Sequence, residues 1–241
     1  MPKHEGHGFG AYWLPYLSFM LVGEVAGRAP EEWSPYFLPL KIAFPLGFLF
    51  FYFGRGQLQE LRGYRPGIGA IGLDFLVGVV LALMWMAPYV FIDSLRPDPE
   101  DAFDPEQLGA SLVWLTLGLR LAGFALVTPF MEEIFVRSWL QRFSDVVDTR
   151  KDFRSIPIGR FTQRSFIVVV IAFVVTHVPW EWPVAFAWIV LTQLWFYHRK
   201  HITPLVIVHF ASNFTIFLCV VLGNGKLTDS EGNPLLLWFF L

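Results

Sequence analysis

The chain has 241 residues, of which 55% are hydrophobic, 18% are aromatic and only 16% are charged. Soluble domains carry more charge and far fewer long apolar runs, so this composition excludes an ordinary soluble enzyme. The formal net charge is −2, and no basic cluster alternates with aromatic residues, which argues against nucleic-acid binding. Apolar runs recur along the whole length, and we expect residues 1–241 to form a single integral membrane domain in the lipid bilayer.

Seven apolar segments approach the roughly 20 residues that a membrane-spanning helix needs. They predict an all-α, polytopic transmembrane helix bundle with seven spans, or eight if one long span is broken. The expected spans, in chain order, are Ala11–Val25, Pro35–Phe53, Ile68–Ile92, Leu121–Leu140, Ser165–Trp180, Pro183–Tyr197 and Ile202–Leu222. Pro15 and Glu24 interrupt the first segment, which favours a retained helix over a cleaved signal peptide. The apolar tail Pro234–Leu241 is too short to span and is expected at the membrane interface.

The charges between the spans alternate in sign. Basic residues follow the second, fourth and sixth spans: Arg55, Arg62, Arg65, Arg142, Arg150, Lys151, Arg154, Arg160, Arg164, Arg199 and Lys200. Acidic residues follow the third span: Asp93, Asp98, Glu100, Asp101, Asp104 and Glu106. Because cytoplasmic loops are enriched in Lys and Arg, this pattern places the basic loops and the N-terminus in the cytoplasm.

The fourth span contains the motif Glu132-Glu133-x-x-x-Arg137. A charged group at membrane depth costs roughly 2.5–3.5 kcal/mol on insertion scales, so such residues require a reason. Glu133 and Arg137 are four residues apart, a spacing that favours an ion pair on one helix face. Glu132 points about 100° away from Glu133 and can face a cavity. Arg120, just before the span, is expected to extend to the outer interface.

Two further motifs place polar side chains one helical turn apart, Phe173-x-x-x-His177 and His209-x-x-x-Asn213. Each has a structural explanation when taken alone, because a histidine can be a satisfied core residue and an asparagine can cross-link helices. Counted at 1.5 Å per residue from the basic ends of their spans, Glu132, His177 and His209 lie roughly 13, 18 and 10 Å deep. This agreement favours one shared site that water reaches from the cytoplasmic side.

The three motifs resemble those of the CPBP family, the CAAX proteases and bacteriocin-processing enzymes also called the Abi family. Its members carry Glu-Glu-x-x-x-Arg, Phe-x-x-x-His and His-x-x-x-Asn motifs, in that order, on successive membrane helices. The chain matches all three motifs, and the resemblance covers about Gly109–Leu222. It implies an intramembrane endopeptidase that needs no metal and hydrolyses a membrane-associated protein or peptide.

The resemblance also implies a role for each motif residue. Glu132 would be the general base that activates a water molecule held between it and His177. Glu133 would pair with Arg137 and shape the site, while His209 and Asn213 would stabilise the tetrahedral oxyanion. Phe173 is expected to stack beneath His177 and orient it.

The segment Met131–Leu140 also resembles a bacterial subgroup named CAAX prenyl protease-related, found beside exosortase sorting systems. Membership would place the protein in a bacterial inner membrane, with its active site open toward the cytoplasm. Prenylated substrates are not expected in such a membrane. The substrate would then be another membrane-associated peptide or protein.

Two alternatives remain open from the sequence. His177, His209 and Glu132 could bind zinc, since two histidines and a glutamate are the ligand set of some metallopeptidases. The polar residues could instead only pack helices in a membrane scaffold or transporter, although the chain has no internal repeat typical of transporters. The sequence leaves the roles of Asp74, within the third span, and of Arg120 undecided.

Overall fold

A computed structural model of the protein describes residues 8–98, 102–147 and 151–241. The expected all-α fold is confirmed in these ranges, where seven helices and a single isolated β-bridge are present. The helices are α1 Phe9–Ala26, α2 Ser34–Gly54, α3 Ile68–Phe91, a continuous helix Ala110–Val146, α7 Gln163–Val175, α8 Trp182–Arg199 and α9 Ile202–Gly223. Three of the loop charges considered above, Glu100, Asp101 and Arg150, lie outside the described residues.

Four of these helices are long and apolar enough to cross a membrane. They are Pro35–Gly54 within α2, Ile68–Phe91, Ala110–Val146 and Ile202–Gly223, as expected of an integral membrane protein. The 13 residues of α7 extend only about 20 Å at 1.5 Å per residue, less than the roughly 30 Å of a bilayer core. The count of seven or eight spans therefore stays a prediction.

The helix Ala110–Val146, here called the motif helix, differs from the expected fourth span in where it begins and in its internal geometry. It begins well before Leu121, so Arg120 lies within the helix and not at its outer end. It consists of a short 3₁₀ turn followed by α4 Val113–Leu121, a π-helical segment Ala122–Val127, α5 Thr128–Glu133, a second π-helical segment Ile134–Leu140 and α6 Gln141–Val146. The two π-helical segments flank the Glu132-Glu133 pair, a placement that is common at functional sites.

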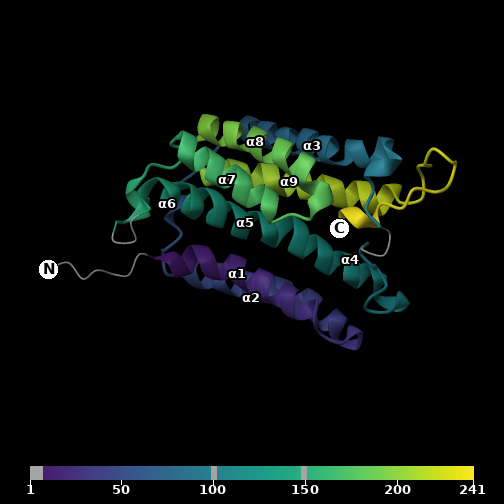
Figure 1. The fold of residues 1–241 in the computed structure, drawn as a ribbon. Coiled ribbons are helices and arrows are strands. Elements are labelled where there is room, and N and C mark those ends of the chain that lie inside the picture. Colours follow the sequence, from purple (N-terminus) through teal and green to yellow (C-terminus); the bar gives the residue numbers. More distant parts are fainter. Residues whose placement is uncertain (1–7, 99–101, 148–150) are drawn as a thin grey trace.

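Figure 1 shows the motif helix between two groups of helices. The pair α1 and α2 lies on one side, and α3, α7, α8 and α9 lie on the other. The closest approach of α3 to α9 is at Gly78, where a Cβ atom would lie 2.3 Å from the Val208 carbonyl oxygen. Ser212 fixes this contact, because its hydroxyl donates to the Gly78 carbonyl at 2.9 Å. Small residues allow such close packing between membrane helices, and here they hold the His209 helix against α3.

The two ends of the bundle differ in charge. One end, where α1 begins, also holds the segments 55–67, 151–164 and 199–201. These segments carry Arg55, Arg62, Arg65, Lys151, Arg154, Arg160, Arg164, Arg199 and Lys200. We call this the basic end. The opposite end is mainly acidic and includes Glu24, Asp93, Asp98, Asp104, Glu106, Glu181, Asp229 and Glu231.

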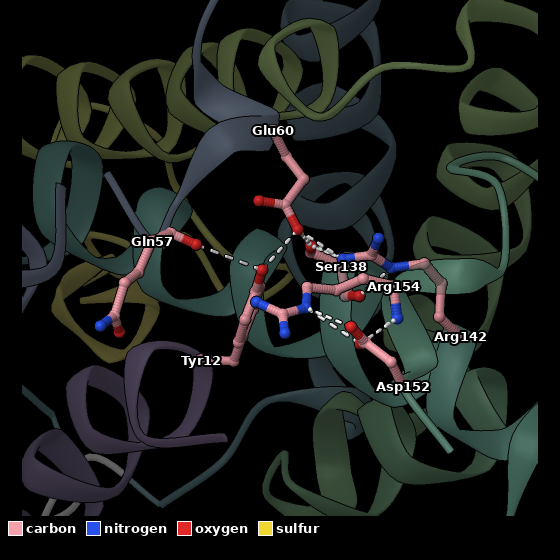
Figure 2. A network of polar contacts seen from close by, with 7 residues as sticks. All are labelled: Tyr12, Gln57, Glu60, Ser138, Arg142, Asp152 and Arg154. Atoms are coloured by element: carbon pink, nitrogen blue, oxygen red, sulfur yellow. Dashed lines mark hydrogen bonds and ion pairs between the residues drawn. The ribbon is translucent and has the colours of Figure 1, made fainter. Parts of the chain in front are cut away.

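A polar network closes the basic end between α1, the segment after α2 and the motif helix (Figure 2). The Glu60 carboxylate accepts hydrogen bonds from the Tyr12 hydroxyl at 2.7 Å and the Ser138 hydroxyl at 2.6 Å, and it forms an ion pair with Arg142. Burial alone would raise the pKa of Glu60, but these hydrogen bonds and the Arg142 charge together hold it below the usual value. Glu60 thus joins three segments at this end.

Further polar contacts join the other helices near the basic end. Asp74 forms an ion pair with Arg199 at 2.8 Å and accepts a hydrogen bond from the Trp195 indole at 2.9 Å, which ties α3 to α8. Gln193 on α8 donates to Gln141 on the motif helix at 3.2 Å. The sequence left the role of Asp74 undecided, and the structure places this residue in a helix–helix contact.

Candidate active site

Glu133 and Arg137 form the expected ion pair inside the bundle. Glu133 Oε2 lies 2.9 Å from Arg137 Nη1, and the two side chains are 0% and 1% exposed. Arg137 Nη2 donates to the Thr192 hydroxyl on α8 at 2.7 Å, and its guanidinium carbon lies 5.8 Å from the centre of the Trp188 ring. Removing either charge would leave the other buried without a partner, so the pair holds the motif helix against α8 at a defined rotation.

His209 lies between the two adjacent glutamates. Its Nδ1 is 3.0 Å from Glu133 Oε1 and its Nε2 is 3.9 Å from Glu132 Oε2. Because Glu133 is paired with Arg137 and so accepts hydrogen bonds, Nδ1 of His209 carries the proton that it donates to Glu133. A series of contacts therefore runs from Arg137 through Glu133 and His209 to Glu132.

Glu132 differs from Glu133 in its exposure. Its side chain is 19% exposed against 0% for Glu133, and it lines a cavity of about 570 Å³. His177, His209 and Asn213 line the same cavity. The structure thus brings residues of all three sequence motifs to one cavity, while Glu133 and Arg137 support it from behind.

His177 was expected within a span, but it lies two residues past the end of α7 and is oriented by the last turn of that helix. Its Nδ1 lies 2.7 Å from the Phe173 carbonyl oxygen, an atom that can only accept, so Nδ1 carries a proton. In the neutral ring, Nε2 is then a hydrogen-bond acceptor. The Phe173 ring lies 4.4 Å from the imidazole and the Trp85 ring 5.6 Å from it, centre to centre. The expected stacking of Phe173 against His177 is present, at an interplanar angle of 38°.

Trp188, on α8, packs among the motif residues, and the sequence analysis did not identify it. Its ring stacks on Phe173 at 5.1 Å and meets the His209 ring edge-on at 4.8 Å. Trp188 is 3% exposed and lines the cavity wall. Thr192, the partner of Arg137, was missed as well. A tryptophan and a threonine one helical turn apart in an apolar segment were the available signal.

Asn213 has a structural task that follows from Pro129. In the π-helical segment, the Thr128 N–H bonds to the Gly123 carbonyl five residues before it. The next bond in this pattern would join the nitrogen of residue 129 to the Phe124 carbonyl, but proline has no N–H. The Asn213 side-chain amide donates to the Phe124 carbonyl instead, at 2.7 Å. One N–H of that amide is thereby used, and the second remains for another acceptor.

The cavity extends from the motif residues away from the basic end. Its wall includes Pro97 and the segment Trp180–Glu181, which lie at the opposite end of the bundle. Access was expected from the basic end, whereas this cavity extends away from that end. The side from which water enters stays a prediction. Depth along single helices cannot reveal which end is open, and the Glu60 and Asp74 contacts close the basic end. Phe239–Leu241 of the apolar tail also lines the cavity, although the tail was expected at the membrane interface.

Two cationic residues line the outer part of the cavity, Lys41 from α2 and Arg120 from the motif helix. The expected extension of Arg120 to the outer interface is wrong. Its guanidinium packs 5.3 Å from the Phe103 ring centre and 5.4 Å from that of Phe124, and its Nε is buried without a hydrogen-bond partner. The cause is the early start of the motif helix, which places Arg120 about 15 Å from Ala110 at 1.5 Å per residue.

The zinc alternative required three ligands in one place. Within the described ranges, no group of three or more His, Cys, Asp and Glu side chains is arranged to hold a metal ion. His209 Nδ1 is engaged by Glu133 and His177 Nδ1 by a backbone carbonyl, which leaves one nitrogen on each ring. The contacts among the motif residues are hydrogen bonds and ion pairs within the protein.

Comparison with protein families identifies the motif region. Residues 113–215 match the model described as Rce1-like, type II CAAX prenyl endopeptidase Rce1-like. This range includes every residue of the three motifs. No curated protein sequence and no solved structure matches the chain. Residues 113–215 are therefore similar to an Rce1-like type II CAAX prenyl endopeptidase domain, a domain of peptide hydrolases.

Proposed function

We propose that the protein is a glutamate-dependent intramembrane endopeptidase that hydrolyses a peptide bond of a membrane-associated protein or peptide. The observation that carries the proposal is the position of Glu132, a partly exposed carboxylate that faces the cavity 3.9 Å from His209 Nε2. In the reaction, Glu132 takes a proton from a water molecule, whose oxygen attacks the substrate carbonyl carbon. The proton then passes to the leaving amine, which completes the hydrolysis.

The histidines and Asn213 have complementary roles in this proposal. His177, with its proton on Nδ1, accepts a hydrogen bond from the water molecule at Nε2. Asn213 donates its remaining amide N–H to the oxyanion, and His209 does so from Nε2 when both of its nitrogens are protonated. Donors fixed in a water-poor site stabilise developing charge without reorganising.

The orientation in the membrane follows from the loop charges. By the excess of Lys and Arg in cytoplasmic loops, the basic end faces the cytoplasm and the cavity opens on the other side of the membrane. Substrates would then reach Glu132 from the outer side or from the bilayer. The cavity lies between the two groups of helices, because α1 and α2 line it on one side and α3, α7, α8 and α9 on the other.

The test compares host membranes that contain the wild-type protein, the Glu132→Gln variant or a Glu24→Gln control at equal levels. Glu24 is an exposed residue paired with Arg28 and lies outside the cavity. Mass spectrometry of new protein N- and C-termini reports cleavage directly. We expect termini that are present with the wild type and the control and are absent with Glu132→Gln. Identical termini in all three membranes, with the variants folded, would contradict the proposal.

Metal removal separates the two chemistries that the motifs allow. We expect cleavage by purified protein to be unchanged after incubation with 1,10-phenanthroline, because in this mechanism Glu132 and not a metal activates the water. Loss of cleavage, restored by added Zn²⁺, would instead assign Glu132, His177 and His209 to a metal site. The same preparation treated with a non-chelating isomer of phenanthroline controls for effects on the membrane.

A further inference from the structure

Lys41 and Arg120 are two cations on one cavity wall whose charges no described acidic residue balances. In the structure, both lie inside helices that are long and apolar enough to cross a membrane, where an unpaired charge is costly. Neither forms an ion pair with a carboxylate of the described residues. Arg120 lies close enough to Lys41 for their charges to repel. Two neighbouring cations inside the bundle do not stabilise each other. Their presence beside one cavity points to an anionic ligand that binds there.

The surroundings of the two residues show that they do not simply extend to the membrane surface. The Lys41 ammonium lies 5.2 Å from the Phe19 ring centre on α1, and a Cβ added at Gly23 would meet its terminal atoms at 3.1 and 3.3 Å. Arg120 packs between two aromatic rings with a buried Nε. Aromatic faces attract cations, so both head groups are held inside the bundle beside the cavity.

One acidic side chain lines the outer cavity, but it does not form an ion pair with either cation. Glu181 lines the wall and lies outside the expected spans, and burial raises its pKa to about 7. In weakly acidic solution this residue is mostly uncharged. The outer half of the cavity therefore has a positive field, while the inner half contains Glu132.

We propose that Lys41 and Arg120 form a subsite for a carboxylate of the peptide substrate, which holds the chain in register with Glu132. The proposal rests on the proposed function, because it assigns the substrate class of the same cavity. A guanidinium presents several N–H donors in a planar fork that suits a carboxylate, and Lys41 adds a second charge. A lipid phosphate at the same place would obstruct the route to Glu132.

The spacing along the motif helix predicts where the substrate is cut. Arg120 and Glu132 are twelve positions apart, or at most about 18 Å at the α-helical rise of 1.5 Å per residue, because the π-helical segment between them is wider and shorter. Both side chains lean toward the helix N-terminus, so the spacing of their ends is similar. An extended peptide spans at most 3.3–3.6 Å per residue, and the bound carboxylate therefore lies about five residues from the hydrolysed bond.

The experiment uses apolar peptides with one Asp placed at successive positions, each made with a free or an amidated C-terminus. Binding is measured by fluorescence to the Glu132→Gln protein in phosphatidylcholine nanodiscs, so that no cleavage occurs. We expect the carboxylate peptides to bind at least tenfold more tightly than their Asn or amide counterparts, as for a hydrogen bond to a charged group. Amidation identifies an α-carboxylate as the ligand, and the Asp series identifies an acidic side chain.

Variants assign the preference to the subsite. Adding Lys41→Gln or Arg120→Gln should abolish the preference for carboxylate peptides, and Arg120→Lys should retain part of it. The control is Lys226→Gln, at an exposed site at the same end of the bundle. It should leave the preference unchanged. Equal unfolding midpoints exclude misfolding. A preference that survives both Gln substitutions overturns the subsite. A second outcome also overturns the subsite: carboxylate and amide peptides bind equally, and phosphatidylglycerol displaces both equally. The two cations would then bind a lipid headgroup.

Cleavage by the wild-type protein separates this inference from the proposed function. Mass spectrometry of the products should place the cut about five residues from the carboxylate. Cleavage that ignores the carboxylate would overturn the subsite and leave the protease standing. A carboxylate preference in binding, with no cleavage of any peptide by the wild type, would support the subsite and contradict the protease.

Discussion

Glu132 and Glu133 are adjacent in sequence, but their surroundings give them different chemistry. Glu133 is fully buried, and Arg137 and His209 occupy both of its oxygens. It can orient neighbouring groups but cannot exchange a proton with a substrate in the cavity. Glu132 is partly exposed and approaches only His209 closely. The rotation of about 100° between consecutive helical residues produces this division between a buried carboxylate and one that faces the cavity.

Arg137 provides a test of the supporting role. Arg137→Gln should leave Glu133 buried without its partner, which costs roughly 3–5 kcal/mol of stability. The double variant Arg137→Met/Glu133→Leu removes both charges and should recover most of that stability. It should remain inactive, because His209 then has no acceptor for Nδ1. Unfolding midpoints in detergent and the cleavage assay measure the two effects, and an active double variant would contradict the role given to Glu133.

Glu181 predicts how stability depends on pH. Its pKa is raised by burial to about 7, whereas glutamate in an unfolded chain titrates near 4.3. Between these values the folded protein binds a proton that the unfolded chain has lost, so the free energy of unfolding falls as the pH rises toward about 7 and then levels. Glu181→Gln should remove this slope. Unfolding midpoints at several pH values test it, with the exposed Glu24→Gln as the matched control.

At the scale of elements, the motif helix depends on a coupling between Pro129 and Asn213. Pro129 lacks the N–H for one backbone hydrogen bond, and in the π-helical segment the bonds run to the residue five positions earlier. Asn213 on α9 supplies the missing donor. Around Pro129 the motif helix is thus widened and hydrogen-bonded to α9. This contact also aligns α9, and with it His209, relative to the two glutamates.

The coupling can be measured with a double-mutant cycle. Asn213→Leu should destabilise the protein by about 1–3 kcal/mol, because it leaves the buried Phe124 carbonyl without a donor. Pro129→Ala restores a backbone N–H near that carbonyl and should recover part of the loss when combined with Asn213→Leu. Unfolding midpoints of the four proteins give the interaction energy. Strictly additive effects would contradict the coupling.

At the scale of the whole molecule, polar contacts join the helices at the basic end, and the cavity extends toward the opposite end. The Glu60 network in Figure 2, the Asp74–Arg199 pair and the Gln193–Gln141 hydrogen bond join helices near the basic loops. No such network lies among the residues that line the outer cavity in the described structure. The side chains that set the membrane orientation therefore also restrict access to the site from that side.

Labelling in intact host cells tests this orientation. We would introduce Lys226→Cys at the acidic end and Lys200→Cys at the basic end, each in a Cys219→Ala background because Cys219 is the only cysteine. A membrane-impermeant maleimide should label residue 226 in intact cells and residue 200 only after lysis. The reverse pattern would place the cavity mouth in the cytoplasm. Labelling of both sites in intact cells would indicate a damaged membrane and require a repeat with sealed vesicles.

The sequence by itself determined the elements and the residues of the candidate site. Long apolar runs leave few alternatives to helices, because backbone groups in a bilayer must bond within their own segment. Each of the seven expected segments contains a helix in the structure, although the fifth ends at Val175 and not at Trp180. Polar residues in such runs stand out because a polar side chain is costly inside a bilayer. Glu132, His177, His209 and Asn213 could be selected for this reason, and the Glu133–Arg137 pair followed from their spacing alone.

Only the tertiary structure decided how these residues meet and how the site is reached. The contact of His209 with both glutamates, the packing of Trp188 and the bond from Asn213 to Phe124 depend on the rotation and depth of separate helices. Local sequence does not encode these quantities, because they result from packing between segments far apart in the chain. The same packing places α2 beside the motif helix. It therefore also decides the direction of the cavity and brings Lys41 and Arg120 to one wall.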